Sequence, residues 1–218
     1  MAKQSVVVVG LGRFGTSVAR TLAEHGHEVL GIDINIQAVE NANDFVTQAV
    51  QADATSEGIL IELGVRNFDV GVVAIGADLK SSVLVTLALK RLGLSHVVAK
   101  AQDEMHGEIL RRLGADTVVM PNHDTGVRVA HAISAPSLVD YMQITDGYAV
   151  AKMLVPAALD GKQIADLQLR ERHGLTAVIL FRPRDKGLFV NPSKYETLAT
   201  GDTLVVSGSE EQLDEWRN

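Results

Sequence analysis

Three glycines near the start of the sequence have the spacing of a phosphate-binding loop. They follow a run of valines in the stretch "VVVVGLGRFG", as Gly10-x-Gly12-x-x-Gly15, between an apolar strand and an amphipathic helix. The first glycine allows a tight turn, the second lets the backbone approach a phosphate, and the third lets the helix pack on the strand. Amide groups at the start of the helix then face the phosphates. The alternative is a tight strand-to-helix connection without a ligand. The pattern predicts a nucleotide site on Gly10, Leu11, Gly12, Arg13, Phe14 and Gly15.

An acid follows at the distance that a nucleotide ribose requires. Asp33 ends the second predicted strand, 18 residues after Gly15, and Ile34 and Asn35 continue the same turn. A carboxylate at this position accepts hydrogen bonds from ribose hydroxyls. It also disfavours a 2′-phosphate, which argues against NADP. The alternative is that Asp33 only caps the helix that begins at Ile36.

Further candidates follow other predicted strands, at the sheet edge where such folds bind ligands. The stretches "ADAT" and "AIGA" are expected to flank an adenine and its ribose, and a lysine in "VAKA" to meet a phosphate; the alternatives are ordinary loop residues and a solvated lysine. The guanidinium of Arg13, inside the glycine loop, can bind a distal phosphate of its own nucleotide or of a nucleotide in a neighbouring subunit. The alternative is a solvated arginine. The residues concerned are Asp53, Ala54, Thr55, Ile75, Gly76, Ala77, Lys100 and Arg13.

The elements that must position these residues alternate between strand and helix. Short apolar runs predict strands at 5–9, 28–32, 47–51, 70–75, 96–100 and 117–120, and amphipathic patterns predict helices at 14–25, 36–43, 56–63, 80–92 and 104–113. Pro121 is expected to close the last strand, and a helix at 124–134 to lead out of the domain. Continuous valine runs are typical of parallel strands that helices cover on both faces. The pattern predicts an α/β fold with a Rossmann-like, doubly wound parallel sheet.

The remaining sequence predicts a smaller α+β domain. After the small-residue break "SAPS", strands are expected at 149–155, 177–182, 188–190 and 203–207, with a short helix at 163–167. The stretch "RDKG" predicts a hairpin turn, and a final helix at 209–216 has Ser209 as its N-cap. We therefore predict a nucleotide-binding domain with a crossover helix at 1–134, and a linker with a C-terminal domain at 135–218.

Composition excludes several classes of protein. The net charge of −7 argues against a nucleic-acid binder, and the absence of cysteine excludes disulfides and thiolate metal sites. No apolar run approaches the roughly 18–20 residues of a membrane span, and the early strand leaves no room for a signal peptide, so we expect a soluble cytoplasmic protein. None of the seven histidines pairs with an acid or base at a spacing typical of catalysis, nor is a metal-ligand spacing present. The sequence therefore favours a nucleotide sensor over an enzyme.

Several motifs resemble those of a known family. The stretches "VVGLGRFG", "GIDI", "VAIGA", "VAKAQ" and "LGADTVVMPNHDTG" resemble the RCK-N (TrkA-N) domain. The stretches "GKQIADLQLRERHGLTAVIL" and "LATGDTLVVSGSEEQL" resemble the RCK-C (TrkA-C) domain. The resemblance covers nearly the whole chain and is to the KtrA/TrkA family of potassium uptake regulatory subunits, in the layout with one copy of each domain.

The resemblance implies a function and an assembly. Members form octameric rings of dimers, bind ATP or ADP in the Rossmann-like site, and gate a KtrB-like potassium channel subunit at the cytoplasmic face of the membrane. Arg13 matches an arginine that reaches the γ-phosphate across the dimer, Asp33 matches the ribose acid, and Asn35 follows it. The stretch Asp53, Ala54 and Thr55 matches the adenine-side loop, and Lys100 matches a conformation-sensitive lysine near the phosphates. An NAD(H)-sensing subunit of the same family, and a small NAD-dependent oxidoreductase, are the alternatives.

Two further sites are implied by the resemblance. Relatives often have a glutamate after the proline that ends the sixth strand, near a Mg²⁺ or Ca²⁺ ion bound with ATP; here that residue is Asn122, a weaker, neutral ligand, with Asp124 nearby. In some relatives paired C-domains bind cyclic di-AMP. Arg170, His173 and Gly174 are at comparable positions, and the alternative is a turn with surface charges.

Overall fold

The computed structural model describes residues 3–134 and 138–217, and the chain divides into two compact units, Met1–His123 and Asp124–Asn218. Helix α6 (Pro121–Ser134) begins in the first unit and continues into the second. The boundary after residue 134, taken from the sequence, stays a prediction, and residues 135–137 of the predicted break lie outside the described residues. No helix in the described part of the chain is both long enough and apolar enough to cross a membrane.

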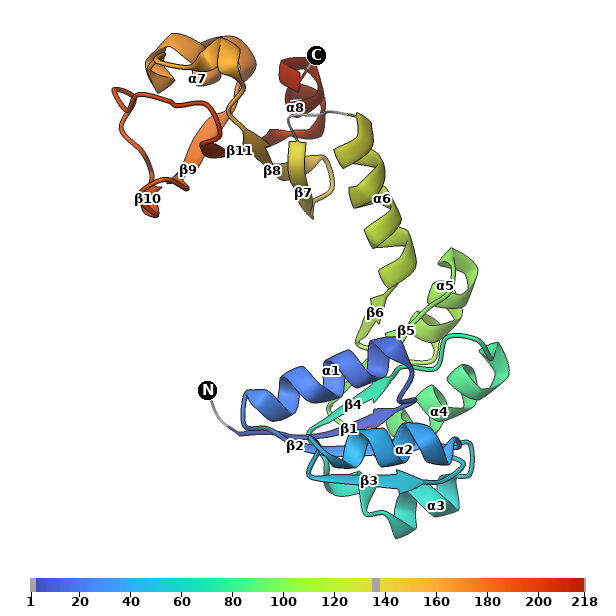
Figure 1. The fold of residues 1–218 in the computed structure, drawn as a ribbon. Coiled ribbons are helices and arrows are strands. Elements are labelled where there is room, and N and C mark those ends of the chain that lie inside the picture. Colours follow the sequence, from blue (N-terminus) through green and yellow to red (C-terminus); the bar gives the residue numbers. More distant parts are fainter. Residues whose placement is uncertain (1–2, 135–137, 218) are drawn as a thin grey trace. The chain divides into compact units, whose positions relative to one another are not determined.

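The first unit is built on a parallel sheet of six strands in the order β3-β2-β1-β4-β5-β6 (Figure 1). The strands are β1 (Ser5–Val9), β2 (Glu28–Asp33), β3 (Gln48–Gln51), β4 (Val70–Val73), β5 (His96–Lys100) and β6 (Thr117–Val119). This order reverses between β1 and β4, which opens a crevice at their carboxyl ends. The predicted Rossmann-like fold is confirmed.

Helices cover both faces of this sheet, which explains the run of valines in β1. Val6 and Val8 point into a core under α1 (Arg13–Glu24) and α2 (Ile36–Asn43). Val7 and Val9 point into the other core, under α3 (Glu57–Glu62), α4 (Leu79–Arg91) and α5 (Glu104–Arg112). All four valines are at most 2% exposed. Alternate side chains therefore enter opposite cores, and both must be apolar.

Two predicted element ends were wrong. Strand β4 ends at Val73, so Ile75, Gly76 and Ala77 form a loop. Pro121 does not close the last strand, as predicted, but begins α6. Strand β6 ends at Val119. Proline suits the first helical turn because its fixed φ is helical and its missing N–H would have no partner there.

The second unit has an antiparallel sheet of five strands in the order β10-β9-β11-β8-β7 (Figure 1). The strands are β7 (Leu138–Thr145), β8 (Tyr148–Leu154), β9 (Thr176–Arg182), β10 (Gly187–Val190) and β11 (Thr203–Ser209). The helices are α7 (Leu169–His173), α8 (Glu210–Arg217) and the 3₁₀ turns η2 (Ala157–Leu159) and η3 (Ile164–Leu167). The predicted β9–β10 hairpin is confirmed, and Ser209 caps α8 by accepting a hydrogen bond from Gln212 N–H at 3.2 Å.

Strand β7 and helix α7 were not predicted. β7 lies at the sheet edge and pairs with β8 alone, and its sequence interrupts the apolar residues with Asp140, Gln143 and Thr145. Helix α7 is only five residues long. The pairing of β7 with β8, rather than its local sequence, selects its strand conformation. Helix α7 is too short to present a helical apolar pattern.

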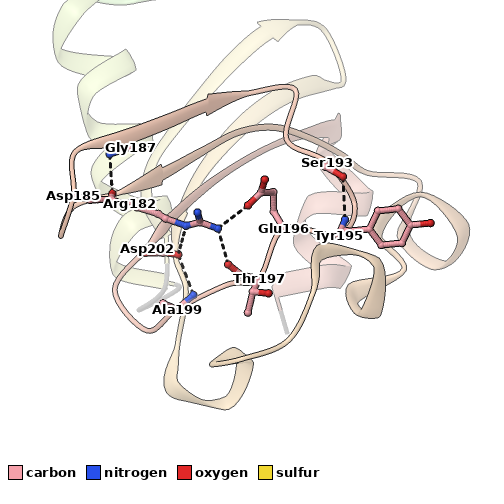
Figure 2. Close-up of polar contacts among 9 residues, drawn as sticks. All are labelled: Arg182, Asp185, Gly187, Ser193, Tyr195, Glu196, Thr197, Ala199 and Asp202. Carbon is pink, nitrogen blue, oxygen red and sulfur yellow. Dashed lines mark hydrogen bonds and ion pairs between the residues drawn. The ribbon is translucent and has the colours of Figure 1, made fainter.

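A charged network ties the end of β9 to the loop before β11 (Figure 2). Arg182 Nη2 donates to Glu196 Oε2 at 2.8 Å and to the carbonyl of Thr197 at 2.9 Å, and its Nε lies 3.8 Å from Asp202 Oδ2. The guanidinium also lies 4.6 Å from the ring centroid of Phe189 on β10. Asp202 is only 2% exposed. Arg182 therefore serves as the cation that lets a carboxylate remain buried in this unit.

Replacing Arg182 with methionine should destabilise the second unit by about 2–3 kcal/mol, because Asp202 and Glu196 would lose their cation while the aliphatic packing remains. Urea unfolding can be followed through Trp216, the chain's single tryptophan, which belongs to the same unit. The exposed Arg184 in the neighbouring turn is the matched control, and Arg184→Met should change stability by less than about 0.5 kcal/mol. Equal unfolding midpoints for the two variants would contradict this role of Arg182.

Candidate functional site

The glycine loop closes tightly because two of its glycines leave no room for a side chain. Gly10 has a φ of +96°, and its N–H donates to the carbonyl of Ile32 at 2.8 Å. A Cβ atom on Gly15 would lie 1.8 Å from the carbonyl oxygen of Gly10. Both glycines are thus explained by the fold alone, and neither by itself indicates a ligand.

Gly12 is different, because the fold gives it no steric reason to be glycine. A Cβ atom there would meet no described atom within 4 Å, and its φ of −70° suits any residue. Gly12 is the N-cap of α1, and within the described residues no side chain caps this helix end and no acid lies in its first turn. The first amide groups of α1 have no acceptor within their own helix, and Gly12, Arg13 and Phe14 line a hollow at this positive end of the helix dipole. Such an end is suited to an anion that approaches the backbone closely.

Asp33 joins the glycine loop to the turn after β2. Its Oδ2 accepts the N–H of Leu11 at 2.6 Å, and its Oδ1 accepts the N–H of Asn35 at 2.8 Å. The N-cap of α2 is Asn35, whose Oδ1 accepts from Gln37 N–H at 2.9 Å. The interpretation of Asp33 as the cap of that helix is therefore wrong. Asp33 fixes two backbone segments and still faces a hollow with its carboxylate.

One hollow in this unit, the Asp33 hollow, has a volume of about 480 Å³. It collects candidates from the ends of four strands, β1 to β4, namely Gly10, Asp33, Ile34, Asp53, Ala54, Thr55 and Ile75. It also contains residues that the sequence reading missed, which are Val9, Ile32, Ala52, Asp78, Lys80, Ser81, Leu84 and Val85. The D-x-x-S pattern from Asp78 to Ser81, typical of a helix N-terminus, was the available signal for the polar members of that group.

Local hydrogen bonds hold two other carboxylates of the Asp33 hollow in their charged form. Asp53 Oδ1 accepts from the hydroxyl of Thr55 at 2.7 Å and from its N–H at 2.9 Å, and these bonds lower the pKa of Asp53. Asp78 caps α4, and the hydroxyl of Ser81, 2.5 Å away, is the largest cause of its lowered pKa. Ionised carboxylates accept hydrogen bonds and do not donate them, so this hollow suits ligand hydroxyl or amino groups.

The second hollow, the Lys100 hollow, has a volume of about 710 Å³ and opens beside Gly12. Its lining residues are Gly12, Arg13, Phe14, Ala74, Gly76, Ala77, Lys100, Ala101, Gln102, Pro121 and Asn122. Lys100 Nζ lies 5.5 Å from the ring centroid of Phe14, and a Cβ atom on Gly76 would lie 2.8 Å from Lys100 Nζ. Gly76 thus leaves room for the lysine chain. Two cations and no carboxylate line this hollow, so it suits phosphate groups.

Three of the predicted candidates lie outside both hollows. Leu11 is 4% exposed and packs against Gly31, so it contributes its N–H to Asp33 rather than its side chain to a ligand. Gly15 allows the close approach of α1 to the glycine loop, and Asn35 caps α2. The structure therefore separates the candidates into residues that line a hollow and residues that shape it.

The candidates in the second unit do not gather at one place. Arg170 lines a hollow of about 660 Å³ with Glu171 and Lys194. The ring of His173 instead lies 6.4 Å from that of Trp216, and Gly174 is the left-handed C-cap of α7 with a φ of +65°. Of the three, Arg170 is the one that lines this hollow.

In the described part of the chain, no group of three or more histidine, aspartate or glutamate side chains is arranged to hold a metal ion. Asn122, at the position where relatives are expected to carry an acid, lines the Lys100 hollow with a neutral amide. The ionisable side chains that line this hollow are those of Arg13 and Lys100.

Two domain models match separate parts of the chain. The TrkA-N domain model matches residues 6–121, and the TrkA-C domain model matches residues 150–218. The chain is 36% identical over 211 residues to Ktr system potassium uptake protein A of Bacillus subtilis, covering 97% of this chain and 94% of that protein. It is 35% identical over 206 residues to Ktr system potassium uptake protein A of Vibrio alginolyticus, covering 94% and 93% of the two chains.

A solved structure shares the fold. The GsuK channel bound to NAD superposes with a TM-score of 0.69 at 21% identity, covering 97% of this chain. This chain spans 38% of the channel's own length. At that identity the likeness is one of fold alone.

The two glycines at positions 12 and 15 should respond differently to a methyl group. Gly15→Ala should destabilise the first unit by at least about 2 kcal/mol, because its Cβ atom would overlap the Gly10 carbonyl. Gly12→Ala should cost about 1 kcal/mol, because alanine is a poorer N-cap than glycine but its methyl group meets nothing. Thermal denaturation followed by circular dichroism compares the two variants with the unaltered chain. Equal losses would show that the space around Gly12 is not open.

Proposed function

The chain belongs to the family of potassium uptake proteins that combine a TrkA-N with a TrkA-C domain, and from this premise we propose that it is a nucleotide-sensing regulatory subunit of a potassium uptake system. The observation that supports nucleotide binding is the open space at Gly12, at the N-terminus of α1 and beside the Lys100 hollow. Gly10 of the same loop lines the Asp33 hollow. A bound nucleotide would place its ribose at Asp33 and its phosphates at Gly12, Arg13 and Lys100. The protein would sense the nucleotide and not convert it.

We propose ATP and ADP as the ligands, because of the charges in the Lys100 hollow. A dinucleotide would extend a second ribose into that hollow, and its lining offers cations and no carboxylate to bind ribose hydroxyls. Successive phosphates match Arg13 and Lys100 better. NAD(H) remains the second candidate, supported by the shared fold with the GsuK channel that binds NAD. For Mg²⁺ or Ca²⁺ the hollow offers Asn122 and no acid, which fits an ion carried by the phosphates.

The assembly and the partner are part of the proposal. We propose that the chain forms dimers that assemble into an octameric ring, lies in the cytoplasm, and acts on a KtrB-like potassium channel subunit in the membrane. Near full-length identity with Ktr proteins supports a partner of that kind. Cyclic di-AMP is a further candidate ligand for the C-terminal unit, supported by Arg170 and Lys194 on one hollow.

The first test is calorimetric titration of the nucleotide-stripped protein with ATP, ADP, NAD and NADH, with and without Mg²⁺. ATP and ADP should bind more tightly than NADH. Gly12→Ala should weaken ATP binding at least tenfold while the protein stays folded, because its methyl group fills the space a phosphate would occupy. Tighter binding of NADH would replace ATP with NAD(H) as the ligand, and no binding of any of the four would refute a nucleotide site.

The second test concerns Arg13. Arg13→Ala should lower ATP affinity by roughly 10–100-fold and ADP affinity by less, because a charged hydrogen bond to the last phosphate contributes about 1.5–3 kcal/mol. Arg20→Ala on the same helix is the control, since the Arg20 guanidinium stacks on Phe45, 3.9 Å from its ring centroid, and lines neither hollow. A variant without Arg13 that still distinguished ATP from ADP as the unaltered chain does would refute its role.

A further inference from the structure

A buried histidine contacts a residue that lines the Lys100 hollow. His106, on α5, is 1% exposed and lines neither hollow. Its Nδ1 faces the backbone N–H of Gln102 at 3.2 Å, and Gln102 lines the Lys100 hollow. Its Nε2 lies 3.2 Å from the hydroxyl of Ser82 on α4, a side chain that is completely buried. One imidazole therefore connects the wall of the candidate phosphate site with a neighbouring helix.

The partners of this ring determine its protonation state. A backbone N–H can only donate, so Nδ1 must accept and carries no proton. The proton of the neutral ring is therefore on Nε2, which donates to Ser82 Oγ. Both ring nitrogens are satisfied in this state, as a buried polar group requires.

A second proton would break this arrangement. It would have to bind Nδ1, and two N–H groups would then face each other across 3.2 Å. Gln102 is two residues beyond Lys100, and Lys100, Ala101 and Gln102 all line the hollow. If Gln102 moves away from a charged ring, the wall of the hollow moves with it.

We propose that His106 makes nucleotide binding at the Lys100 hollow sensitive to acid, because only its neutral ring holds Gln102 in the wall of the hollow. The proposal rests on the proposed function, namely that this hollow binds the phosphates of a nucleotide. His106 acts as a positioning residue and does not contact the ligand.

The groups around the ring fix the direction of the effect. Helix α4 contributes the neutral hydroxyl of Ser82, and the β5–α5 connection contributes the neutral amide of Gln102. Asp103, the N-cap of α5, contributes a carboxylate that favours the charged ring. Burial outweighs it and lowers the pKa of His106 below its ordinary value of 6.5. The ring is therefore neutral at neutral pH, and affinity should fall only as the pH drops below the lowered pKa, by at most about tenfold per pH unit for one linked proton.

The test is the affinity for ATP between pH 5 and pH 8, by calorimetry, in the unaltered chain, His106→Asn and His96→Asn. Asparagine keeps an acceptor for the Gln102 N–H and does not titrate. His96 lies exposed at the opposite end of β5 from Lys100 and is the matched control. Since ATP itself titrates in this range, the informative quantity is the ratio of affinities between two proteins. The ratio of the unaltered chain to His106→Asn should fall with acid, and the ratio to His96→Asn should stay constant. Constant ratios for both would overturn the proposal.

A second readout needs no ligand. In ¹⁵N–¹H spectra, the amide of Gln102 should shift with the same pH midpoint as the ring nitrogens of His106, and should not shift over that range in His106→Asn. A Gln102 amide that ignores the titration of His106 would overturn the proposal even if the variant failed to fold. Absence of binding of ATP, ADP, NAD and NADH at pH 8 together with a coupled Gln102 amide would refute the proposed function and leave the contact itself intact.

Discussion

The candidate site depends on one carboxylate that holds two loops together. Asp33 accepts the amide of Leu11 from the glycine loop with one oxygen and the amide of Asn35 from the next turn with the other. The first bond fixes where the loop turns after β1, and the contact between Gly15 and Gly10 fixes how closely α1 approaches it. The direction of the first amide groups of α1, and so the place of any phosphate, follows from these two constraints. Asp33 is thus a structural residue and a candidate ribose ligand at once, and its loss would disturb both roles.

The two hollows on the first unit differ in chemistry, although a lysine, Lys80, also lines the Asp33 hollow. Carboxylates kept ionised by their own loops line the Asp33 hollow, whereas Arg13 and Lys100 line the Lys100 hollow. A nucleotide has complementary groups, with hydroxyl donors at its ribose and anionic phosphates at its other end. In the proposed function this match would orient the nucleotide, and its last phosphate would lie near the exposed Arg13.

The sequence was informative where one residue type has one physical explanation. Buried valines predicted the parallel strands, and Gly10, Gly15 and Asp33 predicted the tight loop and its acid. The sequence was silent where the structure depends on contacts between distant segments. Strand β7 is selected by pairing with β8, and the two contacts of His106 come from α4 and from the turn before α5. Whether the lining residues bind a nucleotide stays a prediction, because an open helix end shows the space for a ligand and not the ligand.

The strength of one phosphate contact sets what such a sensor can do alone. A contact worth about 1.5–3 kcal/mol changes relative affinity by roughly 10–100-fold. Moving a two-state protein from about 1:99 to about 99:1 needs roughly 10⁴-fold. A single site with one discriminating arginine therefore shifts the balance only in part. Two sites that switch together multiply their preferences, and two sites of about 100-fold each reach the required factor. In the proposed ring, several linked sites would therefore allow one extra phosphate per subunit to shift the equilibrium almost completely from one conformation to the other.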